Sequence, residues 1–146
     1  MKKSNRLKPV QRLSEAREQD AAKALGDSNR HVSEQEQRLA DLENYREEYA
    51  RYYQQRGEQG VTAAKLMELQ RFLHNLNKAI EQQQQVVAMA KQRSEQSKQQ
   101  WNSARGKSQA LDKVVERYRK EEDRSASRQE QKDNDEYAQR KDSKKL

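Results

Sequence analysis

The sequence predicts an all-α fold, a long two-helix antiparallel coiled-coil hairpin in which helix two overhangs at the C-terminal end. Three observations support this prediction. Only 31% of the 146 residues are hydrophobic and 38% are charged, which is too little apolar material for a globular core but enough for a narrow seam between helices. One proline and four glycines are fewer than a disordered chain usually carries. Apolar residues also recur at coiled-coil spacing along the second half.

Helix one is expected over about residues 9–56, because Pro9 suits the first turn of a helix. Its apolar positions follow alternating steps of three and four residues up to Leu42. The shorter step from Leu42 to Tyr45 leaves room for a local overwinding. The expected seam is Ala21, Leu25, Ser28, Val32, Gln35, Leu39, Leu42, Tyr45, Tyr49 and Tyr52.

The bend is expected at residues 57–61, where Gly57 and Gly60 fall close together in a chain with few glycines. Thr62 can cap the next helix through its hydroxyl group. Helix two is expected over about residues 62–120 or beyond, followed by a polar tail to residue 146. On this view residues 1–146 form one hairpin.

Helix two carries the most regular pattern. Its 3.5-residue spacing is that of a left-handed coiled coil, and several heptads in one phase are a specific signal. All positions except Gln83, Ser94, Ser97 and Ser108 are apolar in the predicted seam: Leu66, Leu69, Leu73, Leu76, Ile80, Gln83, Val87, Ala90, Ser94, Ser97, Trp101, Ala104, Ser108, Leu111, Val115 and Tyr118.

The two helices must run antiparallel, because the bend is too short to connect long helices that run the same way. Folding the chain about residue 59 places Gln35 opposite Gln83, a pair that would fix the register of the coil. The same register places Ser94 opposite Leu25 and Ser97 opposite Ala21, so we expect thin packing there.

Several classes of chemistry have no signal in this sequence. There is no cysteine, which excludes disulfides and thiolate ligands. His31 and His74 lack metal-ligand spacing, and no glycine-rich phosphate loop occurs. The acids are scattered over solvated helix faces without a pocket that could shift their pKa values. We therefore predict a non-enzymatic protein with no catalytic, cofactor-binding or metal-binding residues.

No apolar run approaches the ~20 residues of a membrane span, and the N-terminus lacks the apolar part of a secretory signal. The expected compartment is therefore the cytoplasm. The net charge of +7 arises from interspersed acids and bases, which is typical of a solvated coiled-coil surface. We do not expect nucleic acid as a partner, although a basic nucleic-acid-binding rod or a generic coiled-coil scaffold remains the alternative.

The most informative residues lie beside the seam of helix two. Phe72, Ala79 and Val86 recur every seven residues next to seam positions, with Met67 and Met89 on similar flanks. They either broaden the seam or form an exposed binding stripe. Four of the six tyrosines lie at the same end of the hairpin, and tyrosine is favoured at binding sites.

Residues 38–83, RLADLENYREEYARYYQQRGEQGVTAAKLMELQRFLHNLNKAIEQQ, resemble the FliJ family of flagellar protein export. Residues 130–141, EQKDNDEYAQRK, resemble the ending of that family. The length and the two-helix plan also agree with the family, so the resemblance covers most of the chain.

The resemblance implies a cytoplasmic component of the flagellar type III export apparatus that serves motility and chemotaxis. Such a component is a stalk-like coiled coil in the export ATPase ring, links the ring to the cytoplasmic domain of the FlhA-type export gate, and escorts export chaperones. It would be associated with the inner membrane through protein partners only. By the family pattern, the gate-facing residues are Leu42, Tyr45, Tyr49, Phe72, Leu76 and Ala79, whereas Arg38 and Gln83 depart from the family's residues at two further positions. The residues expected to suit the ATPase ring are Arg117, Arg119, Lys120 and Arg124.

Overall fold

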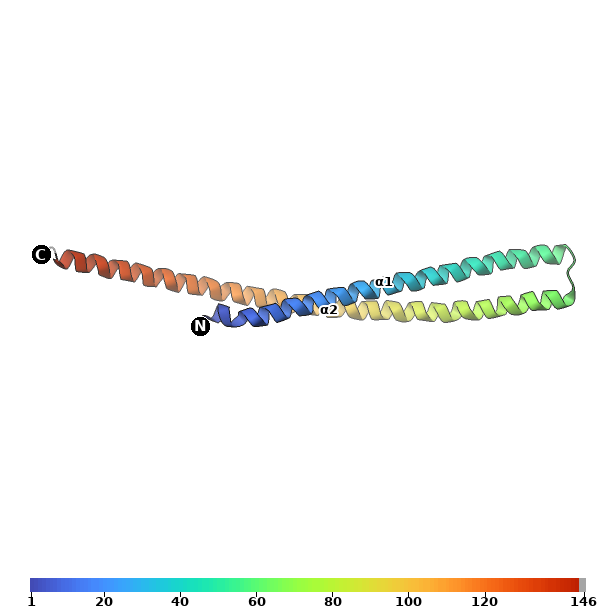
Figure 1. The fold of residues 1–146 in the computed structure, drawn as a ribbon, viewed down its shortest axis with the longest axis horizontal. Coiled ribbons are helices and arrows are strands. Elements are labelled where there is room, and N and C mark those ends of the chain that lie inside the picture. Colours follow the sequence, from blue (N-terminus) through green and yellow to red (C-terminus); the bar gives the residue numbers. More distant parts are fainter. Residues whose placement is uncertain (145–146) are drawn as a thin grey trace. The chain divides into compact units, whose positions relative to one another are not determined.

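The structure is a computed structural model that describes residues 1–144, so the last two residues of the predicted polar tail lie outside it. The chain forms two helices, α1 (Lys3–Glu58) and α2 (Ala63–Lys144), and the described residues include no strand. Figure 1 shows the helices running antiparallel on either side of the bend, which confirms the predicted fold class. The chain divides into two compact units, Ala21–Trp101 and Met1–Asp20 with Asn102–Leu146.

The bend in the unit Ala21–Trp101 depends on one glycine and one hydroxyl group. Gly60 has a φ of 79°, a left-handed conformation that is strained for residues with a Cβ. The Thr62 hydroxyl accepts a hydrogen bond from the Lys65 amide at 3.3 Å, as the predicted N-cap requires. Gly57 remains within α1, so the helix continues to Glu58 and the bend lies later than the sequence suggested.

The seam of α2 agrees with its predicted heptads, because every predicted position from Leu66 to Tyr118 is buried or half-buried. Ile80, Ala90 and Val115 are 2–3% exposed, and they mark where the coil closes most tightly. Apolar burial of this kind provides most of the stability of a long amphipathic helix, whose intrinsic propensity alone is marginal.

The predicted seam of α1 is wrong at two tyrosines. Tyr45 and Tyr52 are 44% and 40% exposed, whereas Tyr49 and Tyr53 are half-buried. The heptad phase therefore continues from Leu42 without an overwinding, and the next seam position is occupied by Arg46, which is exposed. The long aliphatic stem of arginine tolerates such a position while its charged group remains in water.

A polar layer crosses the coil where the sequence predicted it. The Gln83 side-chain amide donates to the Gln35 side-chain oxygen at 2.9 Å and to its main-chain oxygen at 3.0 Å. Gln35 is only 5% exposed, so this pairing satisfies a buried amide.

The predicted positions of the serines need correction. Ser97 is 3.0 Å from the Ser28 hydroxyl rather than opposite Ala21, and the Ser94 hydroxyl donates to Asn29 rather than lying opposite Leu25. Because the bend lies later than predicted, the residues of α1 that face these serines lie nearer its C-terminal end, while the long side chain of Gln83 still reaches Gln35.

In the unit of Met1–Asp20 and Asn102–Leu146, α2 caps the start of α1. The Glu122 carboxylate accepts hydrogen bonds from the Ser4 amide at 3.0 Å and from the Ser4 hydroxyl at 2.6 Å. A carboxylate at this place satisfies a free helix donor and complements the helix dipole. With this cap α1 begins at Lys3, before the predicted start near Pro9, which lies inside the helix.

Beyond Glu122, α2 has no seam partner. Every residue from 123 to 144 is exposed, including Tyr137 at 70%. The orange-to-red end of α2 in Figure 1 accordingly runs as a single helix, the overhang that the sequence predicted.

Candidate protein-binding site

Four aromatic side chains meet beside the bend. The ring centroids of Tyr49 and Phe72 are 4.4 Å apart, and those of Tyr45 and Phe72 are 6.1 Å apart. Tyr45 and Tyr49 are 4.8 Å apart, and Tyr49 and Tyr52 are 6.4 Å apart. These separations lie in the range of favourable aromatic contacts or at its lower edge. We call these four residues the aromatic cluster.

The cluster exists because α1 and α2 each present a row of residues to the same flank of the hairpin. Tyr45 and Tyr52 are one heptad apart on α1, and Phe72 stands one residue before the seam leucine of α2. The register of the antiparallel coil brings these rows together. The rings remain partly open to solvent, since Phe72 is 38% exposed. Phe72 therefore contacts Tyr49 in the seam and still leaves part of its apolar surface uncovered.

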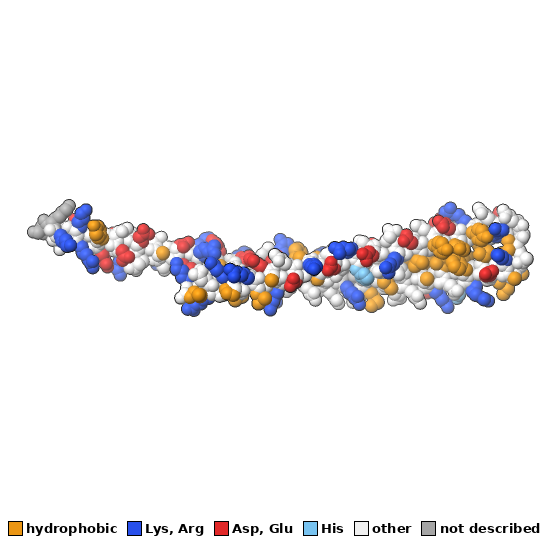
Figure 2. All heavy atoms as spheres, viewed as in Figure 1, with side chains coloured by type: hydrophobic (Ala, Val, Ile, Leu, Met, Phe, Trp, Pro, Cys, Tyr) orange, Lys and Arg blue, Asp and Glu red, His pale blue; other side chains and the backbone are white. Residues whose placement is uncertain are grey.

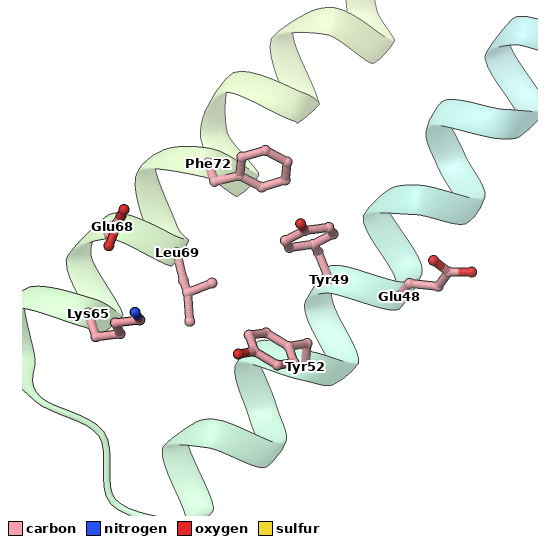
Figure 3. Close-up of a pocket in the computed structure, with 7 residues that line it drawn as sticks. All are labelled: Glu48, Tyr49, Tyr52, Lys65, Glu68, Leu69 and Phe72. Atoms are coloured by element: carbon pink, nitrogen blue, oxygen red, sulfur yellow. The ribbon is translucent and has the colours of Figure 1, made fainter.

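An open hollow adjoins the cluster on the side toward the bend. Figure 3 shows Tyr49, Tyr52, Leu69 and Phe72 pointing into the space between the helices, while Glu48 points to the outer side of α1. The hollow is lined by Glu48, Tyr49, Tyr52, Lys65, Glu68, Leu69 and Phe72. An apolar floor with charged residues at its border is the usual composition of a protein-binding surface.

The tyrosine hydroxyls are also linked. The Tyr45 hydroxyl donates to the Tyr49 hydroxyl at 3.4 Å, a long and weak contact. This contact with Tyr45 raises the pKa of Tyr49 above its ordinary value of 10.0. The Tyr49 hydroxyl is therefore neutral at physiological pH.

The structure brings the predicted gate-facing residues to one flank but buries them unequally. Tyr45 and Phe72 are the most open, Leu42, Tyr49 and Ala79 are half-buried, and Leu76 is 8% exposed. Leu76 is therefore a core residue of the coil, so a substitution there disturbs packing as well as the surface. Arg38 is exposed on the same flank of α1, whereas Gln83 is half-buried and donates its side-chain amide to Gln35.

Of the four basic residues predicted to suit an ATPase ring, three line one shallow face of α2. Arg117, Lys120 and Arg124 share this face with Lys113, and with acids at its borders. Arg119 does not line that face. It lies near Glu122, whose pKa is lowered mainly by the hydrogen bonds from Ser4, with Lys2 and Arg119 adding smaller effects.

Residues 1–144 contain no group of three or more metal-ligating side chains. No helix in that range is long and apolar enough to cross a bilayer.

Three contacts between the helices could not be read from the predicted seam. Tyr53, rather than Tyr52, follows Tyr49 in the seam, and its hydroxyl accepts a hydrogen bond from Gln70 at 3.0 Å. Continuing the heptad from Leu42 would have found it. The Ser4–Glu122 cap and the Lys3 ammonium 5.4 Å from the Tyr118 ring centre connect residues over a hundred positions apart, and no local pattern signals them.

Comparison with known proteins agrees with this architecture. The family model "Flagellar FliJ protein" matches residues 2–146. The flagellar FliJ protein of Escherichia coli K12 is 29% identical over 134 residues, which cover 92% of this chain and 91% of that protein. The flagellar FliJ protein of Salmonella typhi is 28% identical with the same coverage. A solved structure described as that of a YscO homologue from Chlamydia trachomatis aligns with a TM-score of 0.70 at 20% identity, covering 91% of each chain.

Proposed function

The chain belongs to the FliJ family of flagellar proteins, and from this premise we propose that it is a non-enzymatic, stalk-like component of flagellar type III protein export. It is bound in the export ATPase ring, links that ring to the cytoplasmic domain of the FlhA-type export gate, and escorts export chaperones. It works in the cytoplasm beside the inner-membrane export apparatus.

The observation that supports the gate contact is the exposed aromatic cluster. Tyr45 and Phe72 keep 44% and 38% of their surface open beside the seam. Aromatic residues that are held rigidly and remain accessible are the usual anchors of protein interfaces. The proposed gate-binding residues are Leu42, Tyr45, Tyr49, Phe72, Leu76 and Ala79, with Arg38 and Gln83 at the edge.

The test is a pull-down of the purified gate cytoplasmic domain by the full chain. We expect Tyr45→Ala with Phe72→Ala to weaken capture at least about tenfold, because loss of two anchors commonly costs 2 kcal/mol or more. The matched control is Met67→Ala with Tyr137→Ala, which removes two side chains that are 62% and 70% exposed away from the cluster. Circular dichroism checks that both variants stay helical. Equal capture by all three proteins would contradict the proposed gate site.

The contact with the ATPase ring is proposed to involve Arg117, Arg119, Lys120 and Arg124 on α2. Three of these bases share one face, and such a surface suits an acidic lining. We expect Arg117→Ala with Lys120→Ala and Arg124→Ala to slow association with the ATPase in surface plasmon resonance. Arg71→Ala with Lys78→Ala and Arg93→Ala is the charge-matched control. Identical association rates for the two triple variants would argue against this face.

The net charge of +7 is the observation that favours a nucleic-acid-binding rod. That alternative predicts a gel shift with DNA or RNA at moderate salt, and a steep loss of binding as salt rises. Export function predicts no such complex at the concentrations at which the gate domain is captured.

A further inference from the structure

A regular row of acids borders the aromatic cluster. Along α1 an acid recurs every seventh residue, and all members are exposed: Asp20, Asp27, Glu34, Asp41 and Glu48. From Asp27 onward each stands one residue before a seam position, so this row runs along the hairpin just outside the flank that carries Tyr45 and Tyr52. We call Asp27, Glu34, Asp41 and Glu48, which lie in the unit Ala21–Trp101, the acidic row.

The flank beside the acidic row is apolar at the same period. Phe72, Ala79 and Val86 recur every seven residues on α2, and Tyr45 and Tyr52 are seven residues apart on α1. Val86 is 39% exposed and Met89 is 57% exposed, so the apolar stripe continues past the cluster. On the face in Figure 2, hydrophobic side chains gather near the bend, and carboxylates follow one another along the α1 border of that patch.

Most of the acidic row has no charged partner. Within residues 1–144, Glu34, Asp41 and Glu48 form no ion pair, and Asp41 accepts only a neutral amide hydrogen bond from Gln37 at 2.9 Å. Asp27 alone meets a base, Arg30, at 3.4 Å. By contrast, Glu47 on the other side of α1 is paired with Arg51 at 2.7 Å. A line of unpaired acids beside an uncovered apolar stripe favours a cationic partner on this flank. These acids stand out in a chain whose net charge is +7.

We propose that this flank binds one amphipathic α-helix of a partner protein, with apolar residues at heptad spacing and lysine or arginine along the edge that faces the acidic row. The helix would lie as a third strand of the coiled coil. Its apolar residues would cover Phe72, Val86 and the tyrosines, and its basic edge would pair with Glu34, Asp41 and Glu48. The row from Asp27 to Glu48 spans about 32 Å at 1.5 Å per residue, which corresponds to about three heptads of helix.

Heptad order on both sides of the site favours a helix over an extended segment or a loop. A third helix repeats every 3.5 residues when it winds with the coil, so its side chains return to the stripe once per heptad. An extended strand advances about 3.3 Å per residue with a period of two and would lose register with these rows. The acidic row would select the orientation and the identity of the partner helix more than it would raise the affinity.

The inference rests on the proposed function insofar as the gate is the partner that supplies the helix, but the chemistry is testable without the gate. The probes are two synthetic helices of about three heptads with leucine at the seam positions, one with lysine and one with glutamate along a single edge. Fluorescence anisotropy measures their binding to the full chain. We expect the lysine-edged helix to bind about tenfold more tightly than the glutamate-edged helix, as three exposed charge pairs allow.

The decisive variant neutralises the row by Glu34→Gln, Asp41→Asn and Glu48→Gln. Its control, Glu36→Gln with Glu43→Gln and Glu47→Gln, removes three exposed acids from the opposite flank of the same helix. We expect the row variant to lose the preference for lysine and the control to retain it. Absence of peptide binding, absence of a preference, or an equal loss in both variants would overturn the inference.

Parallel pull-downs with the gate domain separate this inference from the proposed function. If gate capture needs the aromatic cluster but not the acidic row, the function stands and the basic-edge inference is wrong. If the lysine-edged helix binds through the row while the gate domain does not bind at all, the inference stands and the gate function is wrong.

Discussion

Replacing one glutamine of the buried polar layer should destabilise the hairpin more than replacing both. In Gln83→Leu, the Gln35 side chain loses its 2.9 Å partner while it is 5% exposed. An unsatisfied buried amide costs about 1–3 kcal/mol. The new leucine at a half-buried position returns up to about 1 kcal/mol of apolar burial. We therefore expect a net loss of about 1–2 kcal/mol, which lowers Tm by about 2–8 °C in a chain of this length.

The double variant, Gln35→Leu with Gln83→Leu, removes both amides and extends the apolar seam. We expect its stability to return to within about 1 kcal/mol of the natural protein, so that the double-mutant cycle gives a coupling of about 1 kcal/mol or more. Urea unfolding followed by circular dichroism measures the four proteins of the cycle, namely the natural protein, Gln35→Leu, Gln83→Leu and the double variant. Gln82→Leu, an exposed neighbour, is the control. Additive effects, or a Gln83→Leu protein as stable as the control, would refute this account of the layer.

Three further predictions concern the ends of the helices. The pKa of Glu122 is lowered by the hydrogen bonds from Ser4, so the stability from this contact is complete above the ordinary glutamate pKa of 4.5 and is lost as pH falls through the lowered value. Ser4→Ala should therefore reduce the stability difference between pH 7 and pH 3, and an unchanged difference in urea unfolding would argue against the cap. Thr62→Ala should lower the free energy of unfolding by about 1 kcal/mol through loss of the N-cap. Gly60→Ala should lower it by about 1 kcal/mol through strain at φ 79°. An unchanged Tm in thermal melts of either variant would contradict the corresponding contribution. Deleting residues 123–146 should leave Tm within about 2 °C of the full chain while reducing the total helical signal, because every residue of 123–144 is exposed; a larger fall in Tm would reveal stabilising contacts of the overhang.

The hairpin could be predicted because its information is periodic. Every seam position of α2 follows from one rule of alternating steps, and the Gln35–Gln83 layer follows from folding that rule back on itself. The errors in the prediction lie at the bend, where the heptad repeat ends and gives no information. Gly57 indicates the end of a helix by sequence alone, because glycine is costly inside one. In the structure Gly57 lies in the last turn of α1, and the backbone takes its left-handed conformation at Gly60 instead.

The candidate site was predictable in its members but not in its shape. A seam that follows apolar residues alone takes Tyr45 and Tyr52, whereas the unbroken heptad from Leu42 leads to Tyr49 and Tyr53. Arg46 can hold the seam position after Leu42, because its aliphatic stem substitutes for an apolar residue while its charge reaches water. Tyr45 then moves to the flank, meets Phe72 at 6.1 Å, and leaves 44% of its surface open. The heptad phase of α1 thus runs through Arg46 and leaves Tyr45 on the binding surface. Arg46→Leu tests whether the heptads themselves hold this phase. We expect added seam burial to raise Tm by about 2–4 °C while the exposure of Tyr45, measured by its rate of iodination, stays unchanged. A fall in that rate would mean that the phase of α1 is not held by its heptads and had shifted to bury Tyr45.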